Sequence, residues 1–208
     1  MKPISIPTVF EPIGTRKKTV LFLGYDRDHT TLIDALLVAN CEVHHTEDEI
    51  PDAQYDLVIS FGYRHLIRQA KIESLGCPII NLHISYLPYN RGAHPNFWSF
   101  FDGTPAGVTI HLIDEGIDTG PILFQKRVVF TENEITFAQT YDRLVNEIEA
   151  LFIGRLPAII ACNWTEQEQV GVGTQHNLCD LPVEFAGWNS VIVDEIKRLR
   201  QITGIQNA

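Results

Sequence analysis

The chain has 208 residues, of which 45% are hydrophobic and 20% are charged, and this composition excludes a disordered polypeptide. The length is enough to bury one sizeable core and corresponds to one or two domains. The formal net charge is −10, whereas proteins that bind nucleic acid usually carry a basic face. We therefore expect no nucleic-acid partner.

Cysteine usage and the lengths of the apolar segments indicate a cytoplasmic protein. No CxxC pair is present, which disfavours a structural zinc site and a disulfide framework. No segment reaches the ~20 apolar residues of a membrane span, and the N-terminal residues lack the pattern of a signal peptide. We expect a chain that does not enter membranes. The four cysteines, which lie far apart in the sequence, are Cys41, Cys77, Cys162 and Cys179.

Strand and helix patterns alternate along the chain from Thr19 onward. Helical spacing of apolar residues predicts helices over 30–40 and 68–76. Strands interleaved with helices predict an α/β, Rossmann-like fold with a mostly parallel sheet and flanking helices. The predicted strands, each a compact apolar run or an alternating segment, span 19–24, 42–45, 56–62, 78–83, 107–114 and 122–130.

The strongest helix signal begins at Thr136, which together with Gln139 forms a capping-box pattern. The apolar stripe that follows is predicted to face the core. Its members are Phe137, Tyr141, Leu144, Ile148, Leu151 and Phe152.

The rest of the chain is assigned by composition. Residues 163–189 are irregular and rich in Gly, Gln and Asn, and a last helix is predicted over 191–202. We predict an N-terminal arm over 1–18, one α/β domain over 19–160 and a short C-terminal helical appendage over 161–208.

Polar residues gather where one predicted strand ends. Asn81 and His83 have the spacing of a strand, so both side chains point to the same side of the sheet at its carboxyl edge, where ligands bind in open α/β sheets. The turn DEGIDTGP adds Asp114, Glu115 and Asp118. This set of groups is suited to acyl chemistry. The amide can donate to an oxyanion, the imidazole can transfer protons, and a carboxylate can orient the imidazole.

The other histidines are interpreted more simply. A histidine at a strand end is more often structural than catalytic, so the constellation carries the hypothesis and not any single member. We predict that the His44–His45 pair lies on the surface and that His111, in an alternating strand, belongs to the core.

The segments NLHISYLPYNRG and GVTIHLIDEGIDTGP resemble the folate-dependent formyltransferases, most closely the nucleotide-sugar N-formyltransferases. The resemblance implies a catalytic N-x-H…D triad of Asn81, His83 and Asp118, with 10-formyltetrahydrofolate as the formyl donor and no metal. A substrate amine would attack the formyl carbon. Asn81 and a protonated His83 would stabilise the resulting oxyanion, while Asp118 holds the imidazole.

The resemblance also implies two binding regions. The pteridine would lie between the segment SFGYRHLI and the loop before Asp118. The acceptor would lie near the run YNRGAHPNFWSF, with Arg91 placed for a diphosphate. The implied cofactor contacts are Tyr63, Arg64, His65, Leu66, Ile113, Asp114, Glu115 and Gly116. The implied acceptor contacts are Tyr86, Asn90, Arg91, His94, Asn96 and Trp98.

The acceptor is expected to be a nucleotide-linked amino sugar. The turn GYDRDHT has one glycine and two aspartates, where glycinamide ribotide enzymes use a glycine-rich loop for the ribose phosphate. A transfer RNA would need a basic surface or domain. The alternatives are formylation of an aminoacyl group, hydrolysis of the formyl folate, and a non-catalytic module that binds folate or a nucleotide. A homodimer is one arrangement we consider, although no pattern decides it.

Overall fold

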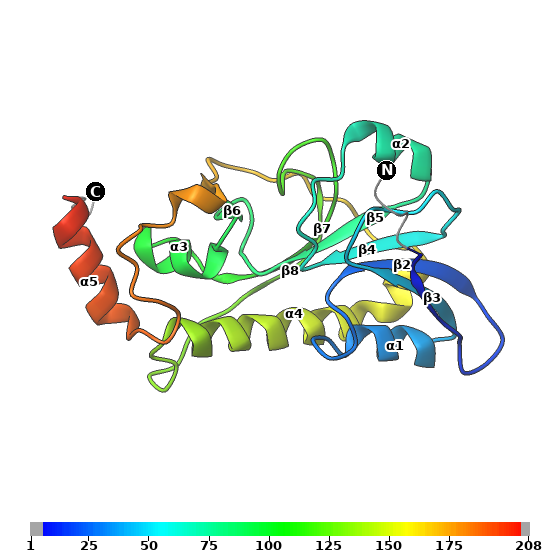
Figure 1. The fold of residues 1–208 in the computed structure, drawn as a ribbon, viewed down its shortest axis with the longest axis horizontal. Coiled ribbons are helices and arrows are strands. Elements are labelled where there is room, and N and C mark those ends of the chain that lie inside the picture. The colour runs from blue at the N-terminus through cyan, green and yellow to red at the C-terminus, as the bar shows by residue number, and fades with distance from the viewer. Residues whose placement is uncertain (1–5, 205–208) are drawn as a thin grey trace.

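A seven-stranded sheet forms the centre of the structure, with the strand order β1-β3-β2-β4-β5-β7-β8 (Figure 1). The four central strands run parallel, and antiparallel strands flank them on both sides. This confirms the Rossmann-like α/β architecture expected from the sequence. The strands are β1 (Thr8–Phe10), β2 (Lys18–Gly24), β3 (Cys41–Thr46), β4 (Leu57–Phe61), β5 (Ile79–His83), β7 (Gly107–Leu112) and β8 (Ile122–Arg127).

The structure is a computed structural model, and it describes residues 6–204. Residues 1–5 of the predicted arm and residues 205–208 of the predicted appendage lie outside the described residues. Within the described part of the arm, strand β1 pairs antiparallel with β3 at the edge of the sheet.

Helices cover both faces of the sheet (Figure 1). Helices α1 (Leu32–Val38) and α4 (Phe137–Ile160) lie together on one face, and the short α2 (Gln69–Leu75) lies on the other. The alternation along β2 fits this arrangement: Val20 and Phe22 pack in the cluster on the α1 and α4 side, whereas Leu21 and Leu23 pack on the α2 side. A strand that is covered on both faces is therefore apolar almost throughout.

Helix α4 begins as the sequence predicts. Thr136 caps it, and the reciprocal hydrogen bonds with Gln139 complete the capping box. Leu144, Ile148 and Phe152 are buried against the sheet. The prediction is wrong for Tyr141, which is 37% exposed and forms a hydroxyl–hydroxyl hydrogen bond of 2.7 Å with Tyr25.

The two adjacent histidines of β3 do not form a surface pair. His45 is buried, and its Nε2 lies 2.8 Å from the carbonyl oxygen of Gly24. The Nε2 of His44 lies 2.8 Å from a carboxylate oxygen of Glu42, and this ring is half-buried. The surface prediction fails because both rings pack near aromatic side chains of the core, His44 edge-on to Tyr55 with ring centroids 5.5 Å apart and His45 beside Phe22 at 6.5 Å.

After α4 the chain returns along the sheet. It forms a bridge between Gln167 and Ile122 and then the strand β9 (Gln175–His176), which pairs with β6 (Arg91–Gly92) in a separate two-stranded sheet. A 3₁₀ turn over Leu178–Asp180 follows. Helix α5 (Ile192–Thr203) then packs on α3 (Pro95–Phe101). The apolar contact between these helices and α4 is formed by Phe97, Trp98, Phe101, Phe137, Ile192, Ile196 and Leu199.

Truncation of a core residue in α4 tests this packing. Phe152 is fully buried, so we expect Phe152→Ala to lower the free energy of unfolding by about 3–5 kcal/mol through lost burial and a cavity. The neighbouring Ile153 is 45% exposed, and Ile153→Ala should change this free energy by less than about 1 kcal/mol. Urea unfolding followed by circular dichroism measures both. Equal losses would contradict the described orientation of α4.

Candidate active site

Polar side chains from two neighbouring strands, β5 and β7, share one face of the sheet near the carboxyl end of β5. Ile80 and Leu82 of β5 enter the core on the α4 side, so Asn81 and His83 point to the opposite face. Asn81 pairs with His111 of the antiparallel β7, and cross-strand partners lie on the same face. The sheet therefore brings these three side chains together.

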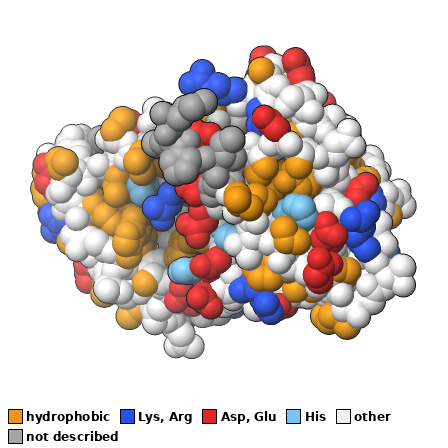
Figure 2. Space-filling view, turned by 45° about the vertical axis from the view of Figure 1, so that its right-hand side comes forward, with side chains coloured by type: hydrophobic (Ala, Val, Ile, Leu, Met, Phe, Trp, Pro, Cys, Tyr) orange, Lys and Arg blue, Asp and Glu red, His pale blue; other side chains and the backbone are white. Residues whose placement is uncertain are grey.

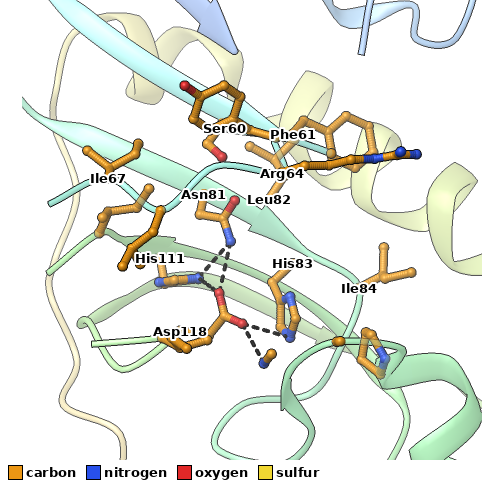
Figure 3. A pocket seen from close by; sticks show the side chains of 18 of the residues that line it. Ser60, Phe61, Arg64, Ile67, Asn81, Leu82, His83, Ile84, His111 and Asp118 are labelled. Carbon is orange, nitrogen blue, oxygen red and sulfur yellow. Dashed lines mark hydrogen bonds and ion pairs between the residues drawn. The ribbon is translucent and has the colours of Figure 1, made fainter. Parts of the chain in front are cut away.

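Asp118 reaches this group from the loop between β7 and β8 (Figure 3). The amide Nδ2 of Asn81 donates to Asp118 Oδ1 over 3.1 Å, and the backbone N–H of Gly92 donates to Oδ2 over 2.8 Å. Nε2 of His83 lies 3.5 Å from Oδ2, and Nε2 of His111 lies 3.4 Å from Oδ1. The structure thus unites Asn81, His83 and Asp118, as the sequence predicts, around one carboxylate.

The environment of Asp118 keeps its carboxylate ionised. Burial alone would raise the pKa of this group. The nearby His83 and His111 and the hydrogen bond from Gly92 outweigh burial and hold the pKa of Asp118 well below its ordinary value of 3.8. The backbone of Asp118 is left-handed, with φ of 53°, a conformation that Asp adopts more readily than most residues.

Hydrogen-bond partners assign the ring protons of both histidines. Nε2 of His83 faces the carbonyl oxygen of Asn90 at 3.0 Å and the carboxylate of Asp118, which are both acceptors. This nitrogen therefore carries a proton. Nδ1 of His111 faces the carbonyl oxygen of Leu112 at 2.8 Å, so this nitrogen of that ring carries a proton.

His111 is a site residue that the sequence analysis assigned only to the core. It is buried, as predicted, but its ring contacts both Asn81 and Asp118. The signal was present in the alternation of GVTIHLID, which places Thr109 and His111 on the face opposite to Val108 and Ile110. Recognition of the antiparallel pairing between β5 and β7 was needed to use that signal.

A cleft of about 790 Å³ opens above these residues. Its lining includes residues 60–67, which contain the end of β4 and the segment after it, and Ile113, Asp114 and residues 116–118 of the loop after β7. The lining also includes residues 92–95, Leu178, Tyr25 and Tyr141. The sequence-predicted residues that line the cleft, besides the triad, are Tyr63, Arg64, His65, Leu66, His94, Ile113, Asp114 and Gly116.

Six other predicted residues are not part of this lining. Glu115 is exposed, on the same loop as Asp118. Asn90 is buried with its side chain bonded to Thr104 and Thr174, and Asn96 donates to the carbonyl oxygen of Phe137. These amides hydrogen-bond within the protein, and a contact of either with the acceptor stays a prediction.

The remaining three predicted acceptor contacts also have partners within the protein. Trp98 is buried and stacks on His176 with ring centroids 3.7 Å apart. Tyr86 packs its ring against Gly107. The guanidinium of Arg91 binds the side chain of Gln169. Their orientation depends on contacts with distant parts of the chain, and their contact with the acceptor stays a prediction.

The described residues hold no group of three or more His, Cys, Asp or Glu side chains that could bind a metal ion. In the same part of the chain, no helix is long and apolar enough to cross a membrane. Basic side chains are scattered among acidic ones on the face shown in Figure 2.

Comparison with known proteins decides the family. The formyl transferase family profile matches residues 36–156, which is more than half of the chain. The chain is also 34% identical to a dTDP-4-amino-4,6-dideoxyglucose formyltransferase of Mycobacterium tuberculosis over 173 residues, which are 80% of this chain and 70% of that protein. The chain belongs to the formyl transferase family. The resemblance stated from the sequence is thereby confirmed.

Solved structures of other formyltransferases support this assignment. The chain is similar to PseJ from Anoxybacillus kamchatkensis, solved in complex with UDP-4,6-dideoxy-4-formamido-L-AltNAc and tetrahydrofolate. The identity is 38%, the TM-score is 0.77, and the match covers 84% of this chain and 96% of PseJ. A likely sugar N-formyltransferase from Mycobacterium tuberculosis is 26% identical with a TM-score of 0.67, over 82% of each chain.

The ionisation of Asp118 is directly measurable. Carbon-13 NMR of aspartate-labelled protein, assigned with Asp118→Asn, should show this carboxylate still ionised at about pH 3, where exposed aspartates take up protons. Folding lowers the pKa of Asp118, so the ionised carboxylate stabilises the folded state. This contribution to the free energy of unfolding is fully present above about pH 4 and is lost as the pH falls through the lowered pKa. A titration midpoint at or above 3.8 would contradict the described environment.

Proposed function

We propose that this formyltransferase moves a formyl group from 10-formyltetrahydrofolate to the amine of an amino sugar linked to a nucleotide. The observation that carries the proposal is the group of Asn81, His83 and Asp118 at the base of an open cleft. The similarity to PseJ, which was solved with a formamido sugar nucleotide and tetrahydrofolate, supports this choice of substrates. A cytoplasmic location remains a prediction from the sequence, and a homodimer remains one arrangement that no sequence pattern decides.

The cleft is suited to a folate. Its volume of about 790 Å³ lies within the range of pockets that hold ligands of this size. Ile67 and Ile113, which belong to one apolar cluster, supply apolar surface in the lining, and the backbone between Gly62 and Leu66 supplies polar groups for a flat heterocycle. When bound, the folate supplies an activated formyl group as the acyl donor.

Asn81 is held in position to donate a hydrogen bond to the formyl oxygen. Asp118 Oδ1, 3.1 Å from the amide nitrogen, uses one N–H of this amide. The second N–H of the amide is therefore available to negative charge that develops in the cleft. Because protein groups already fix this donor, little reorganisation is needed during the reaction.

His83 is suited to proton transfer. Its Nε2–H is held by the Asn90 carbonyl and by Asp118, which leaves Nδ1 as the ring nitrogen that can take up a proton from the acceptor amine. The ring then gains a positive charge, which the ionised carboxylate of Asp118 stabilises. Asp118 contributes by orientation and charge, and it remains ionised throughout.

The acceptor is assigned to the side of the cleft where Tyr25 and Tyr141 lie. Arg64 is the only Arg or Lys among the residues that line the cleft, and in the described part of the chain no ion pair includes it. A second hollow, of about 400 Å³, shares Tyr25 and Arg64 with the lining of the cleft. We assign the diphosphate to Arg64 and the sugar hydroxyls to the two tyrosines, with the pteridine on the side of Ile113.

A panel of amine acceptors tests the function. The protein is incubated with 10-formyltetrahydrofolate and, separately, with nucleotide-linked amino sugars, glycinamide ribotide and aminoacyl compounds. We expect one amino sugar nucleotide to gain the mass of a formyl group while tetrahydrofolate is released. Release without any amine would indicate a hydrolase, formylation of another acceptor alone would exclude the sugar, and folate binding without any release would indicate a non-catalytic module.

Variants of the triad test the catalytic assignment. His83→Ala and Asp118→Ala should each lower the turnover number by at least about 100- to 1000-fold, since each removes a group that acts on the reacting atoms or holds one that does. Circular dichroism should show that both variants remain folded. Glu132→Ala removes an exposed carboxylate distant in sequence from the triad and serves as the control, with unchanged turnover expected. Near-native turnover of either triad variant would exclude the assignment.

The proposed role of Arg64 separates the two substrates. Arg64→Gln should raise the KM for the sugar nucleotide by about 10- to 100-fold, the usual effect of losing a hydrogen bond between charged groups. The KM for the folate should change much less. Arg68→Gln, a nearby exposed arginine outside the cleft lining, is the matched control. A larger effect of Arg64→Gln on the folate would place this side chain with the cofactor instead.

A further inference from the structure

The chain segment after α4 contributes one side chain, Gln169, to the loop that carries Asp118. Its Nε2 donates hydrogen bonds to the carbonyl oxygens of Asp118 and Gly120, both at 2.8 Å. Its Oε1 accepts hydrogen bonds from Nε and Nη2 of Arg91 at 3.1 and 2.7 Å. An amide side chain has two donors and two acceptor positions, and all four are used here. The orientation of the Gln169 amide is therefore fixed.

The strand that carries Arg91 also holds the carboxylate itself. Gly92 follows Arg91 in β6 and donates its backbone N–H to Asp118 Oδ2. Strand β6 is in turn held by β9, through bonds from the Arg91 N–H to the Thr174 carbonyl and from the Ala93 N–H to the His176 carbonyl, both at 2.9 Å. Residues 169–176 thus hold the catalytic loop through two routes, one by side chains and one by backbone.

The backbone of Asp118 requires such support. A residue other than glycine in the left-handed region persists when its surroundings determine that conformation. The carbonyl group of Asp118 is the part of this backbone that Gln169 holds, and the carboxylate of the same residue must stay within reach of His83. A small rotation of the peptide would move the carboxylate away from that ring.

We propose that Gln169 and Arg91 act as one positioning unit that fixes the Asp118 loop, so that the predicted C-terminal appendage sets the geometry of the catalytic carboxylate. Arg91 is then a positioning residue and does not bind the diphosphate. The kinetic part of this inference rests on the proposed function, because formyl transfer is its readout.

A double-mutant cycle tests the unit. Gln169→Ala and Arg91→Ala should each lower kcat by about tenfold and change both KM values by less than about twofold, because the reacting groups are misplaced while the binding walls remain. The double variant should be no slower than either single variant.

Gln169→Glu retains an oxygen that can accept from Arg91, but its second oxygen replaces the donor that faces the carbonyl oxygens of Asp118 and Gly120. Its kcat should therefore be as low as that of Gln169→Ala. Gln167→Ala, whose side chain is exposed and whose backbone forms the bridge to Ile122, is the control with unchanged kcat.

Two kinetic results would overturn the inference. If Arg91→Ala raises the KM for the sugar nucleotide at unchanged kcat, Arg91 binds substrate. If the losses in the single variants multiply in the double variant, the two residues act independently.

A measurement without substrate separates this inference from the proposed function. In Gln169→Ala, carbon-13 NMR should show a titration midpoint of Asp118 that moves upward toward its ordinary value, since the carboxylate is less well held by its partners. Gln167→Ala should leave the midpoint in place. An unchanged midpoint in both variants would show that Gln169 does not position Asp118, whether or not any sugar nucleotide is formylated.

Discussion

The negative charge of Asp118 is the feature around which the cleft is arranged. Only 13% of this side chain is exposed, and a buried charge is costly unless hydrogen bonds and opposite charges compensate for lost water. Compensation comes from Asn81 and His83 of β5, His111 of β7 and the backbone of Gly92 in β6. Because these groups come from three separate elements, the carboxylate is stable only when all three are in place.

The sheet topology makes this convergence possible. The parallel strands β4 and β5 end at one edge, so polar residues at their ends can face a cleft while the apolar positions remain in the core. The change to antiparallel pairing at β7 then places His111 directly beside Asn81. The loop after β7 returns Asp118 to the same place. The two-stranded sheet of β6 and β9 closes the remaining side.

Local patterns were sufficient to predict part of this arrangement. The strand spacing of Asn81 and His83 placed both side chains at one edge of the sheet, and the turn after β7 offered Asp114, Glu115 and Asp118 as acids. The resemblance to the formyltransferases then singled out Asp118. The capping box at Thr136 was predictable because it depends on a short stretch of sequence. The orientation of Asn96 and Trp98 was not, since both face partners that belong to α4 or to the segment after it. Gln169 had no signal at all, because its role depends on a contact with Arg91 distant in sequence.

The central claim, that the ionised Asp118 fixes the state of the histidines beside it, has a direct test in nitrogen-15 NMR of the imidazole rings near neutral pH. Nε2 of His83 faces the Asn90 carbonyl and the Asp118 carboxylate, so we expect a proton on this nitrogen. We also expect a proton on Nδ1 of His111, which faces the Leu112 carbonyl. A His83 ring with its only proton on Nδ1 would leave an unprotonated nitrogen facing two acceptor oxygens and would contradict the account.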